Sequence, residues 1–279
     1  TADEAGRDPG PGEPIEVFFR VRVDLSPRRV PWMKTAVLAP IGMSPPVITE
    51  FLDAINEPVS DLVLFATEHP HVRAGVRFVQ AGLATRYPWL RVHVEVLPFE
   101  DIASNDENFA FMSRAARMIR REREVYHCDR VYLNVAGGRK NMCISLCLLG
   151  QLMVVDGVFH LVSHNVSWIN ERLERFRHDI ELFADVPDHE ARILFEQRKR
   201  DYEALLFPDR STYELIRIPT LPYPSDYLGY LVRGMEEGTA GLTGDDRDML
   251  IQHGLIESIG ETLVVTEHGR RFLEVIYGR

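Results

Sequence analysis

From Met33 onward, short apolar runs alternate with longer amphipathic segments. The apolar runs predict buried strands and occupy residues 35–40, 61–67, 90–97, 129–135 and 157–163. The segments between them have helical spacing and occupy residues 45–55, 72–86, 108–124 and the stretch after Asn141. Strands that alternate with helices predict a mainly parallel sheet covered on both faces and joined by right-handed crossovers. The expected fold class is therefore α/β, with a Rossmann-like domain.

The C-terminal part of the chain has a different pattern. Residues 188–207 are charged and periodic and predict a connecting helix, and residues 212–228 form a bridge interrupted by prolines. Beyond it come two helical segments, two short strands around Gly260 and a final helix, an order typical of a winged helix. We therefore expect an N-terminal extension, a Rossmann-like domain, a connecting helix with linker, and a winged-helix domain, at residues 1–32, 33–187, 188–222 and 223–279.

The stretch before Met33 lies outside the alternating pattern. Residues 1–12 are polar and rich in Gly and Pro, which predicts a disordered tail. Residues 15–24 alternate apolar with polar positions and predict an amphipathic strand at a sheet edge. Because Met33 is itself suited to be a native start, we interpret residues 1–32 as an extension of the basic fold.

Composition narrows the possible functions. Of the 279 residues, 45% are hydrophobic and 27% charged, as in ordinary soluble proteins. No apolar run reaches the roughly 18 residues of a membrane span and no signal peptide is visible, so we expect a cytoplasmic protein without a membrane partner. Three cysteines do not indicate a disulfide scaffold. The formal net charge of −10 disfavours nonspecific nucleic-acid binding but permits a local anion site.

Two turns that follow predicted strands carry candidate chemistry. In a doubly wound sheet, ligands bind beyond the carboxyl ends of the strands, where both turns are expected. The first turn, GMSPP at residues 42–46, places Gly42, Met43 and Ser44 before two prolines. Ser44 is a good N-cap residue, so its hydroxyl either caps the next helix or contacts a ligand.

The second turn is AGGRKN, at residues 136–141. Gly137 and Gly138 would let a phosphate approach the backbone without a Cβ in the way, and the next helix offers free N–H groups. Arg139 and Lys140 oppose the helix dipole, so helix stability does not explain them. The turn therefore predicts a site for a phosphodiester. Neither turn has the spacing of a dinucleotide fingerprint or a P-loop, so no nicotinamide cofactor and no ATPase are expected.

The sequence around these turns resembles a known family. TAVLAPIGMSPPVITEF resembles the first strand and turn of CARF domains, the CRISPR-associated Rossmann-like sensors of cyclic oligoadenylates. VYLNVAGGRKNM resembles their second signature, a Gly-Gly pair followed closely by Lys. With the winged helix, the chain resembles the CRISPR-associated ring nucleases over essentially its whole length after Met33.

The resemblance implies a function and a set of site residues. It implies a homodimer that binds cyclic tetra-adenylate across its twofold axis and cleaves it without metal or cofactor, which switches off type III CRISPR signalling. The products would be linear, with 2′,3′-cyclic phosphate ends. Ser44 would align the ribose 2′-oxygen, and Lys140 would neutralise charge on the phosphate. The expected ligand contacts are Gly42, Met43, Thr67, Glu68, Gly137, Gly138, Arg139, Asn141 and His164.

Some features of the site stay open. Many CARF proteins have threonines where this chain has Ala136 and Arg139, so the preferred ring, tetra- or hexa-adenylate, is undetermined. Thr67, Glu68 and His164 end predicted strands and are interpretable as adenine or ribose contacts or as ordinary loop residues. Cys143 and Cys147 are one helical turn apart, but no Cys or His cluster completes a metal site, so we interpret them as core residues.

The alternative function is a CARF winged-helix transcriptional regulator that senses the ring without cleaving it. From Ser211 to the C-terminus the chain has six Arg, no Lys and eleven Asp or Glu. The expected recognition segment, residues 243–254, carries three aspartates. Because phosphates would repel this surface, DNA binding is not expected, and we expect the wing to pack in the dimer or cover the ligand pocket.

Overall fold

A six-stranded sheet lies at the centre of the fold in the computed structural model, which describes residues 33–164 and 166–278. The strand order is β3-β2-β1-β4-β5-β6, where the first five strands are parallel and β6 is antiparallel to β5. The strands are β1 (Thr35–Pro40), β2 (Val59–Thr67), β3 (Arg91–Leu97), β4 (Arg130–Asn134), β5 (Gly157–Ser163) and β6 (Tyr213–Ile218). The expected α/β class with a mainly parallel sheet is confirmed. The strand predicted at residues 15–24 lies outside the described residues.

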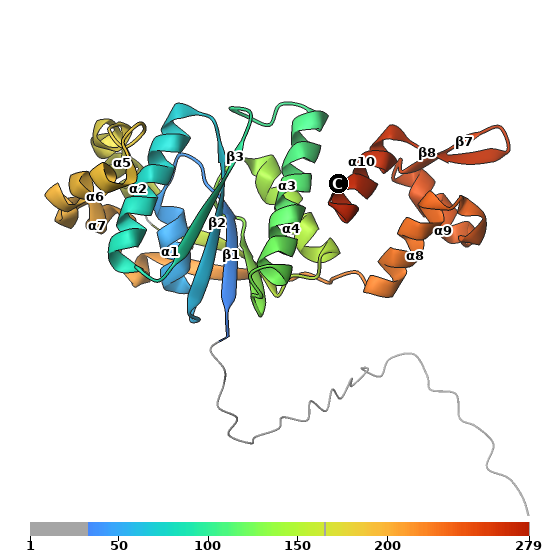
Figure 1. Ribbon diagram of the computed structural model, residues 1–279, viewed down its shortest axis with the longest axis horizontal. Helices are drawn as coiled ribbons and strands as arrows, with labels where there is room; N and C mark the ends of the chain where they lie inside the picture. The colour runs from blue at the N-terminus through green and yellow to red at the C-terminus, as the bar shows by residue number, and fades with distance from the viewer. Residues whose placement is uncertain (1–32, 165, 279) are drawn as a thin grey trace, which may run out of the picture. The chain divides into compact units, whose positions relative to one another are not determined.

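Helices cover both faces of the sheet (Figure 1). One layer consists of α1 (Pro46–Ala54), α2 (Pro70–Arg86), α5 (Val166–Glu181), α6 (Asp188–Gln197) and α7 (Lys199–Leu206). The other consists of α3 (Asn105–Glu124) and α4 (Lys140–Leu152). Because successive side chains of a strand point to opposite faces, every apolar position of β1 is buried on one side or the other.

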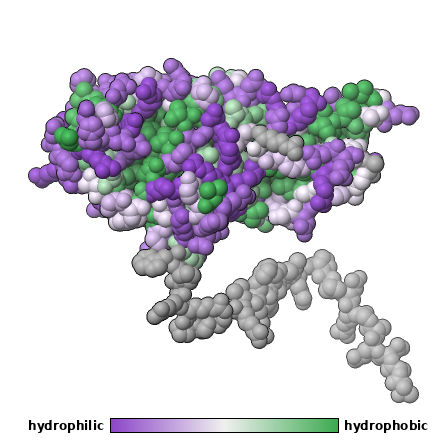
Figure 2. Space-filling model, in the orientation of Figure 1, coloured by the Kyte–Doolittle hydropathy of each residue, from purple (hydrophilic) through white to green (hydrophobic). Residues whose placement is uncertain are grey.

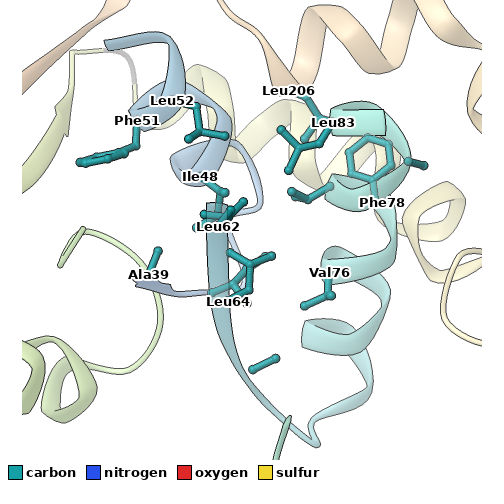
Figure 3. Close-up of a cluster of buried hydrophobic side chains, with 14 of the residues drawn as sticks. Ala39, Ile48, Phe51, Leu52, Leu62, Leu64, Val76, Phe78, Leu83 and Leu206 are labelled. Atoms are coloured by element: carbon teal, nitrogen blue, oxygen red, sulfur yellow. The ribbon is translucent and has the colours of Figure 1, made fainter. Parts of the chain in front are cut away.

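The two cores divide alternate residues of each central strand. Val37 belongs to the core under α1 and α2, and Leu38 to the core under α3 and α4. In β2, Leu62 and Leu64 lie in the first core, where Figure 3 shows them beside Ile48 of α1. Figure 2 shows that hydrophilic residues cover most of the visible outer face of the described part.

The structure differs from the connecting helix and linker expected at residues 188–222. Two helices, α6 and α7, replace the single helix and bring Phe195 and Tyr202 against Phe78 of α2, with ring centroids 5.8 and 5.2 Å away. The predicted bridge contains β6, which pairs with β5 over its full length. A short helical turn, η1 (Arg210–Thr212), precedes it. Apolar burial and backbone pairing therefore make most of this segment part of the Rossmann-like core.

The winged helix has the predicted order of elements. It comprises α8 (Ser225–Glu236), the turn η2 (Thr239–Gly241), α9 (Gly244–Gln252), the hairpin of β7 (Ile256–Ile259) and β8 (Thr262–Val265), and α10 (Glu267–Tyr277). Gly260 has a φ of +63° at the hairpin turn, which explains the glycine expected there. Leu231, Met235 and Leu250 are central to its apolar cluster. Among residues 33–164 and 166–278, no helix is long and apolar enough to cross a membrane.

Glu50 is a carboxyl group buried on α1. The residue is 2% exposed, and its Oε1 has no hydrogen-bond partner within the described part of the chain. Burial raises the pKa of Glu50 from 4.5 to about 7, because the charged form loses hydration. The folded protein therefore holds this proton over a range in which the unfolded chain releases it.

We expect the free energy of unfolding to fall as the pH rises from about 5 to 8. Over this range the folded state binds more protons than the unfolded state, and the Glu50 contribution amounts to at most about 3 kcal/mol. Glu50→Gln should remove most of this dependence and be the more stable protein at pH 8. Urea unfolding at both pH values tests this, with the exposed Glu257→Gln as the control. An equal pH dependence in Glu50→Gln and wild type would contradict the assignment.

Candidate functional site

The two candidate turns lie side by side because β1 and β4 are neighbours in the sheet. The chain passes from β1 to β2 on one side, and β4 lies on the other, so this is the switch point of the strand order. The backbones of the turns touch. A Cβ added to Gly42 would lie 3.1 Å from both the Cα and the amide nitrogen of Gly138.

The glycines of the second turn pack closely against the end of β1. A Cβ on Gly137 would lie 2.5 Å from the carbonyl oxygen of Pro40, and one on Gly138 would lie 2.6 Å from the Pro40 Cβ. Gly138 also has a φ of +77°, which side chains rarely adopt. These glycines therefore let the turn pack on the end of β1, whereas the sequence suggested that they leave space for a phosphate.

Ser44 does not cap α1. The helix begins at Pro46 with Pro45 as its N-cap residue, and no side chain caps it. Ser44 contributes only its carbonyl oxygen, which accepts from the Val47 amide at 3.3 Å. Its hydroxyl has no hydrogen bond to any residue of 33–164 or 166–278. Of the two interpretations of Ser44, helix capping is thus removed, and the hydroxyl is available to a ligand.

The two cations of the second turn are in different states. The Arg139 Nε lies 3.1 Å from the Asp101 Oδ1 in an exposed ion pair. Lys140 is the first residue of α4 and is exposed, and it has no ion pair or hydrogen bond with the described residues. The turn therefore offers one unpaired ammonium group and one guanidinium that an anion would share with Asp101.

Asn141 and Cys143 hold the turn from within the protein. The Asn141 side chain donates to the Ile102 carbonyl at 3.0 Å and accepts from the Met142 amide at 3.0 Å. The Cys143 thiol donates to the Gly137 carbonyl at 2.9 Å. Burial raises the pKa of Cys143 to about 11, so it remains a thiol donor. Asn141, expected to contact the ligand, here fixes the turn to the loop before α3, and Cys143 is a support that the sequence did not indicate.

The other predicted contacts flank the paired turns. Thr67 ends β2 and is 2% exposed, and its Oγ1 has no partner in the described part of the chain. Glu68 and His164 are exposed, at the ends of β2 and β5, and Met43 is exposed in the first turn. Since β2 and β5 lie on opposite sides of the β1–β4 pair, Glu68 and His164 approach the site from opposite directions.

Three helices begin at this edge with bare N-termini. α1, α2 and α4 have no acidic residue in the first turn and no side-chain cap. By contrast, Ser104, Thr243 and Thr266 cap α3, α9 and α10, each of which has acidic residues in its first turn. The positive ends of the helix dipoles favour an anion, although in α1 the Val47 and Ile48 amides already donate to the Ser44 and Pro45 carbonyls. The edge at the paired turns is therefore the electrostatically favoured place for an anion.

Asp61, Glu122 and Cys128 form a separate buried cluster, with potential metal-ligand atoms within 4.8 Å of one another. It lies at the opposite edge of the sheet, near the start of β2. Arg91 bonds to Asp61 and lies 2.8 Å from Glu122, so one guanidinium already pairs with both carboxylates. Burial raises the pKa of Cys128 to about 12, which disfavours the thiolate that a metal needs. We therefore assign this cluster to structural ion pairing.

Several solved structures match this chain at low sequence identity. Csm6 of Enterococcus italicus bound to cyclic hexa-2′-fluoro-hexa-dAMP is 15% identical with a TM-score of 0.41, over 79% of this chain and 46% of that chain. Can2 from Sulfobacillus thermosulfidooxidans in complex with cyclic tetra-adenylate is 13% identical with a TM-score of 0.33, over 88% and 64%. UDP-GlcNAc 2-epimerase from Neisseria meningitidis bound to UDP-GlcNAc is 12% identical with a TM-score of 0.29, over 81% and 55%.

The chain spans less than two thirds of the length of each of these structures. The comparison with curated proteins gives no match.

Family models match both parts of the described chain. The model of the CRISPR-associated protein NE0113 matches residues 44–237, which run from Ser44 of the first turn through β2 to β6 and on through α8. The model of the CARF-associated HTH matches residues 226–278, the winged helix. Since the first of these matches covers more than half of the sequence, the chain belongs to the CRISPR-associated NE0113 family.

Proposed function

We propose that this protein binds a cyclic oligoadenylate, with cyclic tetra-adenylate the first choice, and cleaves it as a ring nuclease. The observation that carries the proposal is the pairing of the two turns, which brings the uncommitted Ser44 hydroxyl and Lys140 ammonium to one anion-binding edge. Membership of a CRISPR-associated family and the CARF-associated HTH support this ligand class. The proposed domain organisation is a CARF domain followed by a winged helix.

The proposed chemistry needs no metal. The N-terminus of α4 holds a phosphate of the ring, the dipole of α1 adds positive potential, and Ser44 orients one ribose. The 2′-oxygen of that ribose attacks its own 3′-phosphorus, and the bond from phosphorus to the next 5′-oxygen breaks. The 2′-proton is transferred to the leaving 5′-oxygen, so the product is linear with a 2′,3′-cyclic phosphate. Lys140 stabilises the charge that develops on the phosphate and the leaving oxygen.

We further propose that two copies form the site together. Lys140, Ile144 and Leu148 are spaced four residues apart on α4 and lie on one stripe of the helix. Ile144 is 62% exposed and Leu148 is 49% exposed, and both line the open cavity between α4 and the winged helix, so the apolar surface beside the candidate lysine is part of that cavity. A twofold contact through this stripe would bring both copies of Lys140 to one ring, and a symmetric ligand suits such a pocket.

The second candidate function is a ligand-sensing regulator, which the match to a CARF-associated HTH favours. The charge of the winged helix argues against DNA as its partner. α9 carries Asp245, Asp246 and Asp248, and Arg270 and Arg271 are both engaged by Glu267. Incubation of the protein with labelled cyclic tetra- and hexa-adenylate in EDTA, followed by chromatography, separates the two functions. Intact rings after hours with excess protein would favour the regulator.

Lys140→Ala should bind cyclic tetra-adenylate but cleave it about 10²–10³ times more slowly, because a preorganised charge donor to the transition state is lost. Ser44→Ala should have the same effect in a milder form. Arg139→Ala should weaken binding more than cleavage, because Arg139 contributes charge to the bound state. Single-turnover cleavage and equilibrium binding measure the two quantities separately.

The control for this series is Lys199→Ala, which removes an exposed lysine that pairs with Glu196 on the far helical layer. It should cleave the ring like wild type. If Lys140→Ala cleaves at the wild-type rate under single-turnover conditions, the turn is a phosphate-binding element only.

Ile144→Glu should convert the proposed dimer to a monomer at micromolar concentration, because two carboxylates would be buried in the contact. Ile259→Glu in the wing is the matched control, since Ile259 is also 62% exposed and lies outside the stripe. Sedimentation or light scattering, with and without the ring, gives the oligomeric state. A wild-type protein that remains monomeric with the ring would refute the proposed two-copy site.

A further inference from the structure

The N-terminal end of α3 and the loop before it contact the second turn. Besides the Arg139–Asp101 ion pair, the Asn141 side chain holds the Ile102 carbonyl at 3.0 Å. One helical turn further along each helix, the Ser145 hydroxyl of α4 donates to the Asn108 side chain at 2.9 Å. The loop before α3 is thus tied to the candidate ligand turn by one exchangeable ion pair and by fixed hydrogen bonds.

The same helix carries the winged helix. α10 packs along α3, as Figure 1 shows. At its start, Arg271 pairs with Asp106, and the His268 ring lies 5.2 Å from the Phe109 ring. At its end, Arg120 of α3 donates to the carbonyl oxygens of residues 275 and 276, where a cation also suits the helix dipole.

Other winged-helix elements face the Rossmann-like part across a hollow. A cavity of about 880 Å³ lies between α3 and α4 on one side and α8, α9 and α10 on the other. Its lining includes Met112 and Leu148 on the first side and Val232 and Phe272 on the second, and the described residues that line it include two histidines but no Asp, Glu, Lys or Arg. The packing of α10 along α3 is thus the main contact, and the cavity leaves space for the winged helix to shift.

We propose that α3 couples the ligand turn to the winged helix, so that ring binding loosens the docking of α10. This inference rests on the proposed ligand. Asp101 and an anionic ligand compete for the Arg139 guanidinium, so ring binding releases the Asp101 carboxylate. Only four residues lie between Asp101 and Asp106, which holds Arg271. Loss of this ion pair, with the hydrogen bonds of Asn141 and Ser145 retained, lets the start of α3 shift and so weakens the contact at the start of α10.

Thermodynamic linkage predicts both the direction and the magnitude of the coupling between ring binding and the docking of α10. A ligand shifts the equilibrium between docked and loosened α10 only if it makes different contacts in these two states. Here the difference is the Arg139–Asp101 ion pair, which the ligand replaces. Because coupling is reciprocal, a variant that weakens the α3–α10 contact must bind the ring more tightly. An exposed ion pair is worth at most about 1 kcal/mol, so the expected effect on affinity is up to about fivefold.

The test compares neighbouring arginines of α10. Arg271→Ala removes the contact with Asp106 and should bind cyclic tetra-adenylate a few-fold more tightly than wild type. Arg270→Ala is the matched control, since Arg270 pairs with Glu267 and the Val265 carbonyl inside the winged helix, and its affinity should be unchanged. Hydrogen exchange of wild type should show faster exchange in residues 267–278 when the ring is bound.

A ligand-free arm separates this inference from the proposed function. Asp101→Asn should by itself speed hydrogen exchange in α10, whereas Glu100→Gln, the adjacent exposed acid, should not. If the ring binds but Arg271→Ala and wild type have equal affinities and α10 exchange is unchanged, the coupling is overturned and the ligand site stands. If the ring does not bind, the proposed function fails. In that case unchanged α10 exchange in Asp101→Asn would overturn the coupling as well.

Discussion

The backbone contact between the turns after β1 and β4 is the constraint on which the candidate site depends. A Cβ on Gly42 would lie 3.1 Å from Gly138, and a Cβ on Gly138 would lie 2.6 Å from the Pro40 Cβ, so the two turns and the end of β1 pack tightly together. The contact sets the separation of α1 and α4, and with it the relation between Ser44 and Lys140. The glycines that resemble a phosphate-binding motif thus act first as packing residues, and the anion site follows from the arrangement they permit.

The two edges of the sheet differ in their electrostatics. At the carboxyl edge, α1, α2 and α4 begin without acidic residues or side-chain caps, so the positive ends of their dipoles remain available. At the amino edge, Arg91 neutralises Asp61 and Glu122 inside the fold. Burial alone would raise the pKa of Asp61, but hydrogen bonds from Ser60, Arg91 and Cys128, together with the Arg91 charge, hold it below its ordinary value. Ion pairing at one edge supports the strand ends while the other edge stays open to a ligand.

Helix α3 joins these features to the winged helix. It begins at the carboxyl edge beside the ligand turn, and Glu122 near its other end reaches the amino-edge cluster. α10 lies along the same helix, where Val275 is fully buried in the core formed with α3 and α4. The acidic winged-helix elements are therefore attached to a helix whose preceding loop contacts the second turn.

The sequence by itself determined the fold class and predicted which two turns would lie side by side. Successive residues Val37 and Leu38 are buried on opposite faces of the sheet, so helices must cover both faces. Because the strands are parallel, the turns after β1 and β4 lie at the same edge. Local pattern could not place β6, because an antiparallel edge strand depends on a partner, β5, that lies about 50 residues earlier. Nor could it show that Asp101 neutralises Arg139 or that Asn141 holds the loop before α3, since those contacts arise only when α3 crosses from β3 toward β4. Whether Ser44 caps a helix or keeps its hydroxyl available was likewise decided by tertiary packing, which starts α1 at Pro46 and leaves that oxygen without a partner among the described residues.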